Sequence, residues 1–324
     1  MRFAVWGDAP YSEAERPLVA RLAEEVNAAD VAFTVNVGDL KGGGACDDAV
    51  YARAAATFGS FSAPLVYVPG DNEWTDCWGG GRDPLERLSV LRRTMFPDGR
   101  SFGQRRLALE QQRPGYPEHS RWQVGPVTAI GLHVVGSNNN LARADAPGPA
   151  RPPAARAAAE AEFRARDEAV AAWLAAGFDA ALAARSSAVA VFLHGDPRFH
   201  VPAAERAAQG VDGFDGLLAA LAEQAGRFPG PVVVVHGDTH FFRHDRPLVD
   251  PASARPVPNV VRVETYGSPL VGWVLVTLDP AAAEPVRAEA RLVAPGPGRR
   301  RASTRAPAAA ARASATTGAS PART

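Results

Sequence analysis

Five times along this chain, a short apolar run stops at a residue that can bind a metal ion. The runs are FAVWG before Asp8, FTVNVG before Asp39, LVYVPG before Asp71, AVAVFL before His194 and VVVVHG before Asp238. Short runs rich in β-branched and aromatic residues are typical of buried strands. Open α/β sheets place their ligand sites just beyond the carboxyl ends of such strands. The chain has only 7 histidines, and three of them, His194, His236 and His240, lie at these ends. Together with the Asp residues there, they predict a metal site assembled from separated loops.

Helical patterns separate the strand-like runs. Residues 18–29 carry helical apolar spacing, residues 47–59 follow as a second helix, and an Ala-rich helix is expected over about 157–184. A further helix begins at Asp83-Pro84, where Asp83 is the expected cap and Glu86 is expected to reach back to the cap amide. The alternation of strands and helices predicts one α/β domain over residues 1–294.

The last thirty residues differ from the rest in composition. Residues 295–324 are rich in Ala, Pro and Arg and lack large apolar side chains, so we predict a disordered tail. The tail holds six of the 35 Lys and Arg residues and no acid, which leaves 29 basic against 35 acidic residues in 1–294. This mildly acidic domain has no electrostatic footprint for nucleic acid, so no nucleic-acid partner is expected.

The two cysteines, Cys46 and Cys77, each follow one of the metal-binding loops. A disulfide between these loops is one hypothesis, and two free thiols in a reducing cytosol is the alternative. No apolar stretch is long enough to span a membrane. No signal peptide is visible, so a cytoplasmic location is expected as the chain stands, or a secreted or periplasmic one if the N-terminus is truncated.

Taken in order, the loop motifs resemble those of the calcineurin-like metallophosphoesterase superfamily. They read G-D-x-P-Y at 7–11, G-D at 38–39, G-D-N-E at 70–73, H-G-D at 194–196 and H-G-D-T-H at 236–240. The G-D-x-P-Y and G-D-N-E motifs are similar to those of a less studied bacterial branch of this superfamily. The resemblance implies a four-layer α/β/β/α sandwich of two mixed sheets. It also implies two metal ions and a bridging hydroxide that attacks phosphorus.

Four residues match the superfamily pattern directly. Asp8 matches the Asp of its D-x-H motif, and Asp39 matches the Asp that bridges the two metals. His194 matches its lone His, and His240 matches the final His of G-H-x-H. The resemblance implies that all four bind metal and that Asp39 is also part of the catalytic machinery.

Three departures leave alternatives open. Pro10 stands where D-x-H has its His, so a ligand is missing unless Tyr11 or water replaces it. In the second departure, either Asp71 is the ligand and Asn72 replaces the proton-donating His, or Asn72 is itself the ligand.

The third departure concerns the last motif, where Asp238 occupies the first His position of G-H-x-H and His236 precedes the glycine. Both are candidate metal ligands, with Asp238 ranked slightly higher. Such an oxygen-rich set favours Mn²⁺ or Mg²⁺, while the histidines still permit Fe²⁺ or Zn²⁺. One or two divalent ions are therefore the expected cofactors.

Three residues near the strand ends are candidate substrate contacts. Asn138 and Asn139 either contact substrate or only form a turn, and Lys41 either binds phosphate or is a solvated charge. The prediction is a metal-dependent hydrolase of phosphomonoesters or phosphodiesters, whose partner is a phosphorylated small molecule. The alternative is a catalytically impaired protein of the same fold that binds metal and a ligand without turnover. The substrate and the oligomeric state stay open.

Overall fold

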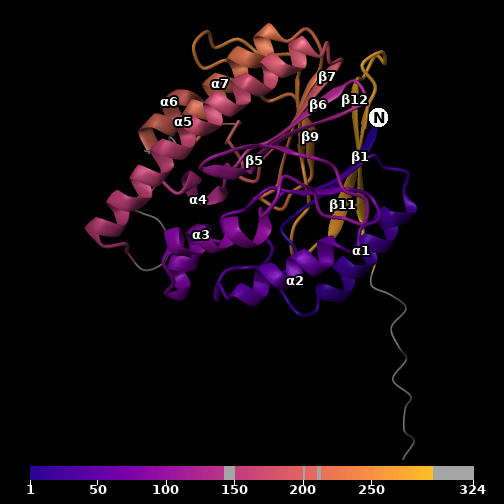
Figure 1. The fold of residues 1–324 in the computed structure, drawn as a ribbon. Helices are drawn as coiled ribbons and strands as arrows, with labels where there is room; N and C mark the ends of the chain where they lie inside the picture. Colours follow the sequence, from indigo (N-terminus) through magenta and orange to yellow (C-terminus); the bar gives the residue numbers. More distant parts are fainter. Residues whose placement is uncertain (142–149, 200, 210–212, 295–324) are drawn as a thin grey trace, which may run out of the picture. The chain divides into compact units, whose positions relative to one another are not determined.

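The structure is a computed structural model that describes residues 1–141, 150–199, 201–209 and 213–294 (Figure 1). The predicted disordered tail, 295–324, lies outside the described residues. Residues 1–294 form one compact unit by their internal contacts, and this unit is described below. None of the described helices combines the length and apolarity needed to cross a membrane.

Two β-sheets form the centre of this unit. The first has five strands in the order β12-β11-β1-β2-β3, with β1, β2 and β3 parallel and β11 antiparallel to β1. Its strands are β1 (Arg2–Trp6), β2 (Thr34–Asn36), β3 (Leu65–Tyr67), β11 (Gly272–Leu278) and β12 (Val286–Leu292). The second has seven strands in the order β4-β5-β6-β7-β8-β10-β9, with β6, β7, β8 and β10 parallel. Its strands are β4 (Glu110–Gln112), β5 (Tyr116–Val124), β6 (Val127–Gly131), β7 (Ala188–Phe192), β8 (Val232–His236), β9 (Arg243–Asp245) and β10 (Val260–Glu264).

Helices cover the outer face of each sheet (Figure 1). Beside the first sheet lie α1 (Arg16–Ala28), α2 (Asp48–Phe58), the 3₁₀ helix η1 (Thr75–Gly80) and α3 (Pro84–Met95). The segments after β6 hold α4 (Gly136–Asn139), α5 (Pro153–Ala183), α6 (Ala203–Gln209) and α7 (Asp215–Arg227), of which α5 and α7 pack on the second sheet. The four-layer α/β/β/α architecture with two mixed sheets is therefore confirmed.

Strand periodicity explains why the sheets are buried on both faces. In β8, Val233 and Val235 pack between the two sheets, whereas Val232 and Val234 pack under the helices. Successive side chains of a strand point to opposite faces, so an uninterrupted apolar run is what a doubly covered strand requires. α5 approaches β6 closely because Gly177 has no side chain, and a Cβ there would lie 2.4 Å from Cδ1 of Ile130.

The predicted elements are present, with small differences. α3 begins at Pro84, and Asp83 caps it by accepting a hydrogen bond from the Leu85 amide. The predicted return contact of Glu86 is absent from the described hydrogen bonds, because its carboxylate pairs with Arg87 instead. Cys46 and Cys77 form a disulfide, which confirms that hypothesis and ties the loop after β2 to η1.

Candidate metal centre

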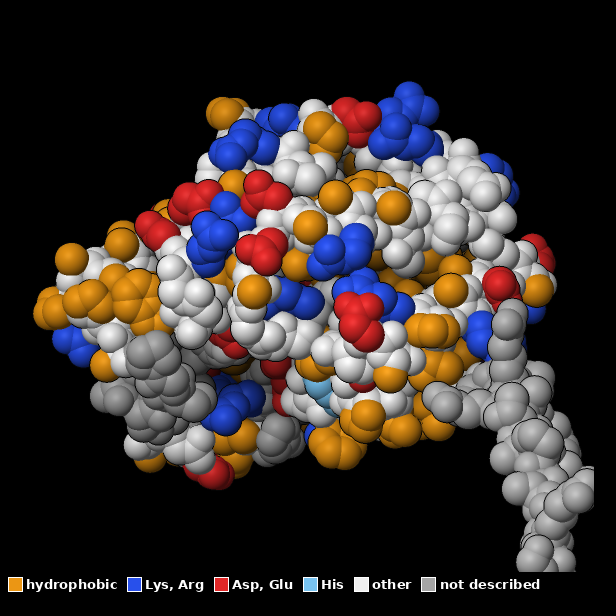
Figure 2. All heavy atoms as spheres, turned by 90° about the horizontal axis from the view of Figure 1, so that it is seen from below, with side chains coloured by type: hydrophobic (Ala, Val, Ile, Leu, Met, Phe, Trp, Pro, Cys, Tyr) orange, Lys and Arg blue, Asp and Glu red, His pale blue; other side chains and the backbone are white. Residues whose placement is uncertain are grey.

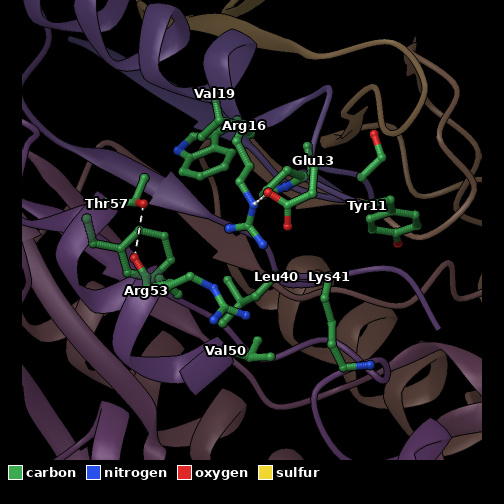
Figure 3. Close-up of a pocket in the computed structure, with 15 residues that line it drawn as sticks. Tyr11, Glu13, Arg16, Val19, Leu40, Lys41, Val50, Arg53 and Thr57 are labelled. Atoms are coloured by element: carbon green, nitrogen blue, oxygen red, sulfur yellow. Dashed lines mark hydrogen bonds and ion pairs between the residues drawn. The ribbon is translucent and has the colours of Figure 1, made fainter. Parts of the chain in front are cut away.

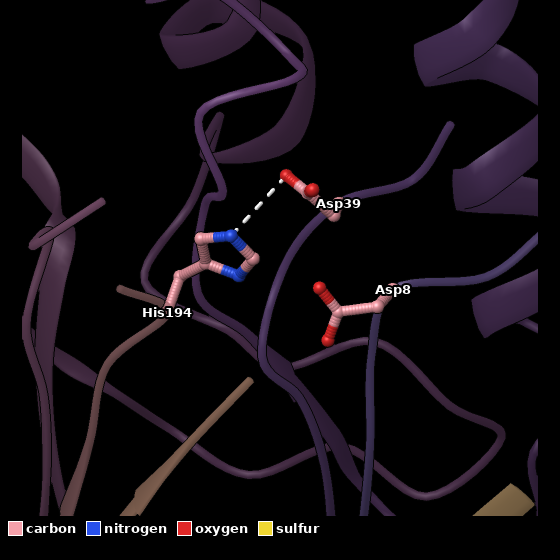
Figure 4. Close-up of side chains that lie close together, drawn as sticks. All are labelled: Asp8, Asp39 and His194. Atoms are coloured by element: carbon pink, nitrogen blue, oxygen red, sulfur yellow. Dashed lines mark ion pairs between the residues drawn. The ribbon is translucent and has the colours of Figure 1, made fainter. Parts of the chain in front are cut away.

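The parallel strands of both sheets end at one edge, and their loops bring the predicted ligands together. Two groups of buried or half-buried side chains each have ligand atoms within 4.8 Å of one another. The first group is Asp8, Asp39 and His194, from the loops after β1, β2 and β7 (Figure 4). The second is Asp71, His194 and Asp238, from the loops after β3, β7 and β8.

His194 lies between the two groups. Its Nε2 atom is 3.0 Å from Oδ1 of Asp71 and 3.3 Å from Oδ1 of Asp39. Its Nδ1 atom lies 2.6 Å from the carbonyl oxygen of Val37, which can only accept, so Nδ1 carries a proton. A neutral His194 therefore presents the lone pair of Nε2 to the carboxylates, as a metal-binding imidazole does.

Asp8 faces two further residues of the loop after β8. Its Oδ1 accepts a hydrogen bond from the Asp238 amide at 3.1 Å and lies 3.6 Å from Nε2 of His240. Nδ1 of His240 is held by the carbonyl oxygen of Ser268 at 2.6 Å, which turns Nε2 toward Asp8. A Cβ on Gly237 would lie 2.3 Å from Oδ2 of Asp8, so a larger residue there would displace the Asp8 carboxylate.

In the second group, hydrogen bonds orient the carboxylates. Asp71 accepts a hydrogen bond at Oδ2 from the Ser137 hydroxyl at 2.8 Å. Asp238 accepts one at Oδ2 from the Asp196 amide at 2.9 Å. Each carboxylate thus keeps its other oxygen, Oδ1, for the centre of the group.

Several ligand candidates have left-handed backbone conformations. The φ angles are 53° at Asp8, 57° at Asp39, 80° at Asp238 and 67° at His240. L-residues rarely adopt this region, and such strain concentrates at functional sites where the surrounding structure imposes it. The strain is therefore a further sign that these strand ends are built to place side chains.

Burial of so many carboxylates is costly without a counter-charge. Burial raises the pKa of Asp8 to about 8 and that of Asp238 to about 6. It also raises the pKa of Asp39 well above its ordinary value. Burial alone would lower the pKa of His194, but the charge of Asp39 and the hydrogen bond with Asp71 outweigh it, and the pKa rises.

No Arg or Lys pairs with these four Asp residues within the part of the chain that the structure describes. Oδ2 of Asp8 is also buried and has no hydrogen-bond partner among the described residues. Buried carboxylates that lack a protein cation are stabilised by a bound metal ion. The residues present therefore fit a divalent metal.

The two candidates of the loop after β3 lie in different places. Asp71 belongs to the second group, whereas the Asn72 side chain is turned to Asp39. Nδ2 of Asn72 donates to Oδ2 of Asp39 at 2.5 Å, and the Asn72 amide donates to Oδ1 at 3.1 Å. This geometry fits the reading in which Asp71 is the ligand and Asn72 replaces the proton-donating His.

Tyr11 follows Pro10, the residue that stands at the histidine position of the D-x-H motif, and its hydroxyl lies beside Asp39. Its hydroxyl forms a short hydrogen bond with Oδ2 of Asp39 and accepts one from Nδ2 of Asn72 at 3.1 Å. Its ring lies edge-on to His240, with centroids 5.2 Å apart. A phenol oxygen thus stands beside the first group in place of the missing imidazole.

His236 lies outside both groups. Its side chain shares the strand parity of Val232 and Val234, so it points toward the helix layer and not between the sheets. Nδ1 lies 3.0 Å from the carbonyl oxygen of Gly237, and Nε2 is 4.0 Å from Glu264. Of the two candidates in this motif, Asp238 is the one that lies with the other candidate ligands.

The side chains of the asparagine turn after β6, Asn138 and Asn139, form hydrogen bonds within the protein. Nδ2 of Asn139 donates to the carbonyl of Gly213, and its Oδ1 accepts from buried Arg166. Asn138 donates to the carbonyl of Leu141 and accepts from the Gly213 amide. These contacts fit the turn-forming alternative better than the predicted substrate contact, because both side chains bind within the protein.

Some residues at this edge were not among the predicted site residues. Ser137 joins Asp71 to Asp76 through its hydroxyl, with 2.9 Å to Oδ1 of Asp76. Glu73 is fully buried and accepts the Leu40 amide at 2.5 Å, which holds the turn at Asp39. The sequence signals that could have indicated Ser137 and Glu73 are the S-N-N-N turn and the acid of the G-D-N-E motif. Lys41 is half-buried and donates to the carbonyl of Gly42 at 3.0 Å, and its predicted phosphate contact stays a prediction.

Most of these side chains are shielded from solvent: Asp8, Asp39, Asp71 and His194 are all buried. On the face shown in Figure 2, a histidine and acidic side chains lie in a hollow, and further acidic and basic side chains are spread over the surface around it.

No family model and no curated protein matches the sequence. Solved structures do match the fold. A dimetal phosphatase from Danio rerio aligns over 91% of this chain and 96% of its own, with a TM-score of 0.50 and 11% identity. A structure of PhoD aligns over 82% of this chain and 56% of its own, with a TM-score of 0.51 and 12% identity. The chain therefore has the α/β fold with two mixed sheets that is found in metallophosphoesterase structures, as the loop motifs predicted.

Proposed function

We propose that the chain is a metal-dependent phosphoesterase that hydrolyses phosphomonoesters or phosphodiesters. The observation that carries the proposal is the pair of groups that share His194 and whose four carboxylates pair with no Arg or Lys of the described residues. The residues that would hold one or two divalent ions are Asp8, Asp39, Asp71, His194, Asp238 and His240.

The donor set favours particular metals. Oxygen atoms outnumber imidazole nitrogens in both groups. Hard oxygen ligands suit Mg²⁺ and Mn²⁺, whereas softer or nitrogen-rich sites suit Zn²⁺. Mn²⁺ or Mg²⁺ is therefore the proposed cofactor, with Fe²⁺ or Zn²⁺ as weaker alternatives.

Paired divalent ions, when bound, supply positive charge for the attacking and leaving oxygens of an in-line displacement. Asp39 lies beside His194, which belongs to both groups. A carboxylate such as that of Asp39 offers two oxygens, one for each of two cations. In the reaction, water forms a bond to phosphorus, the P–O ester bond breaks and the leaving oxygen needs a proton. Asn72 stands where the resemblance places a proton-donating histidine, and its side-chain amide cannot donate a proton to the leaving oxygen. Esters with acidic, activated leaving groups should therefore react fastest.

A protein that binds metal and a ligand without turnover is the rival, and the same loss of the histidine motivates it. The decisive experiment measures metal content and hydrolysis of an aryl phosphate with added Mn²⁺. Asp39→Asn should lose most of the activity, whereas the exposed Asp30→Asn, which removes only a surface partner of Arg2, should not. Bound metal with no turnover of any aryl or alkyl phosphate would support the rival.

A further inference from the structure

A cavity of about 260 Å³ lies beside the metal centre, between α1 and α2 (Figure 3). Its walls include Ala9 and Pro10, which directly follow Asp8, and Leu40 and Lys41, which directly follow Asp39. Ligand pockets of proteins are a few hundred cubic ångströms in volume. The cavity is therefore large enough for a ring-sized group.

Tyr11 separates the cavity from the metal centre. It is one of the lining residues, while its hydroxyl is hydrogen-bonded to Asp39 and Asn72 on the other side. A ligand that extends past the Tyr11 ring would thus contact both the cavity and the metal centre. The cavity is adjacent to the chemistry and distinct from it.

The floor of the cavity is apolar. Val19, Val50 and Phe58 are buried and line it, together with Trp6 at the end of β1. Trp6 is 1% exposed, and its indole N–H has no hydrogen-bond partner among the described residues. A buried indole N–H ordinarily finds an acceptor, so the Trp6 N–H is a donor that no protein group among the described residues uses.

The rim is cationic. The side chains of Arg16 and Arg53 extend into the same space from α1 and α2, and Lys41 lies on another side (Figure 3). Arg16 is paired with Glu13 at 2.7 Å, but no hydrogen bond or ion pair of the Arg53 guanidinium is formed within the described residues. The lining residues therefore include three cations and one carboxylate, although Lys41 also lies near Glu73 and Asp39 of the neighbouring site. Arginine binds carboxylate and phosphate in a planar, bidentate manner.

We propose that this cavity is a subsite for an anionic, ring-sized part of the ligand, so that the enzyme prefers phosphoesters whose leaving group is an aromatic or similar apolar body with its own carboxylate or phosphate. The apolar floor holds the ring, and Arg53 and Arg16 hold the anion. The subsite itself needs only the cavity, whereas its role in substrate choice rests on the proposed phosphoesterase activity of the neighbouring centre.

The first test uses binding alone, so it is independent of catalysis. Benzoate is titrated into the full chain, with benzyl alcohol as the neutral analogue, and binding is followed by ligand-observed NMR. Benzoate should bind more tightly than benzyl alcohol. Arg53→Gln should weaken benzoate by about tenfold, the effect of one charge-assisted hydrogen bond. Arg21→Gln is the matched control, because Arg21 lies on α1, the other helix beside the cavity, but does not line it.

A second variant fills the space without changing charge. Ala54→Phe places a ring into the cavity from α2 and should abolish benzoate binding, with its melting temperature recorded to confirm folding. Equal affinity of benzoate for the parent, Arg53→Gln and a folded Ala54→Phe protein would overturn the subsite. So would an absence of binding to the parent.

The role in substrate choice is tested by turnover with Mn²⁺. 4-Carboxyphenyl phosphate should lose about tenfold in kcat/KM in Arg53→Gln, while 4-nitrophenyl phosphate should change less than twofold. Equal losses for both esters would show that the cavity does not select the leaving group. If neither ester is hydrolysed by the parent while benzoate still binds as described, the phosphoesterase proposal fails and the anion subsite stands.

Discussion

Nε2 of His194 lies 3.0 Å from Oδ1 of Asp71, a residue 123 positions earlier in the chain. The same nitrogen faces Asp39 at 3.3 Å, so one imidazole serves both carboxylate groups. A divalent ion bound between the two groups would take the lone pair of this nitrogen.

His194→Ala should therefore weaken metal binding at both groups at once. Loss of a ligand or of the contacts that orient it costs about 10- to 100-fold in metal affinity or activity. Metal content after dialysis and kcat with Mn²⁺ measure the effect, with the exposed His244→Ala as the control. Retention of full metal content in a folded His194→Ala protein would contradict the shared role.

Tyr11→Phe isolates the phenol oxygen, because it keeps the ring against His240 and removes only the hydroxyl bonded to Asp39. We expect about tenfold weaker metal binding, as for other residues that orient a ligating carboxylate. The melting temperature of the metal-free protein should change little. Metal titration of both proteins decides this, and unchanged affinity would show that Tyr11 only forms the wall of the cavity.

The disulfide between Cys46 and Cys77 closes a loop with a sequence separation of 31. The chain-entropy model gives about 3–4 kcal/mol for such a loop. Cys46→Ser/Cys77→Ser should lower the free energy of unfolding by about that amount in urea. Such bonds form and persist in oxidising environments and are rare in reducing ones. Thiol titration of the denatured protein, isolated without reductant, should find no free thiol.

A second polar cluster supplies a pH-dependent contribution to stability. Glu118 is fully buried and binds Arg92 at 2.5 Å and Nδ1 of His133 at 2.9 Å. Burial by itself raises the pKa of this carboxyl, but the hydrogen bond with His133 and the charge of Arg92 outweigh it and lower the pKa. A lowered pKa contributes stability that is full above the ordinary value of 4.5 and is lost as the pH falls below it.

Glu118→Gln should thus cost about 2–4 kcal/mol at pH 7, since it leaves Arg92 without its buried partner. The difference from the parent should shrink as the pH falls below the ordinary carboxyl range. Urea unfolding at pH 7 and at pH 3 gives both numbers. A difference that does not depend on pH would mean that shape, and not charge, is what Glu118 contributes.

The asparagine turn shows where local sequence reasoning stops. S-N-N-N identified a turn, and the backbone at Asn138 and Asn139 is indeed left-handed, with φ of 55° and 56°. Arg166 decided the use of Asn139, because this buried guanidinium donates to both the side chain and the carbonyl oxygen of Asn139. No local pattern links residues that lie 27 positions apart on different elements.

His236 shows the opposite case. Its sequence neighbours Val232 and Val234 share its strand parity and pack under the helices, so parity alone places its side chain on the helix side. Asp238 follows the strand, where the chain turns with a φ of 80° and points back into the edge. The choice between them was therefore within reach of the strand pattern.

The sequence by itself determined the strands, their order of loops and the edge at which Asp8, Asp39 and His194 meet. It could do so because parallel strands all end at the same side of a sheet, whatever the details of packing. The tertiary structure decided which oxygen faces which nitrogen, that Asn72 turns to Asp39 while Asp71 turns to His194, and that a cationic cavity lies behind Tyr11. Those outcomes depend on side-chain directions and on partners from distant elements, which only the packed chain brings together.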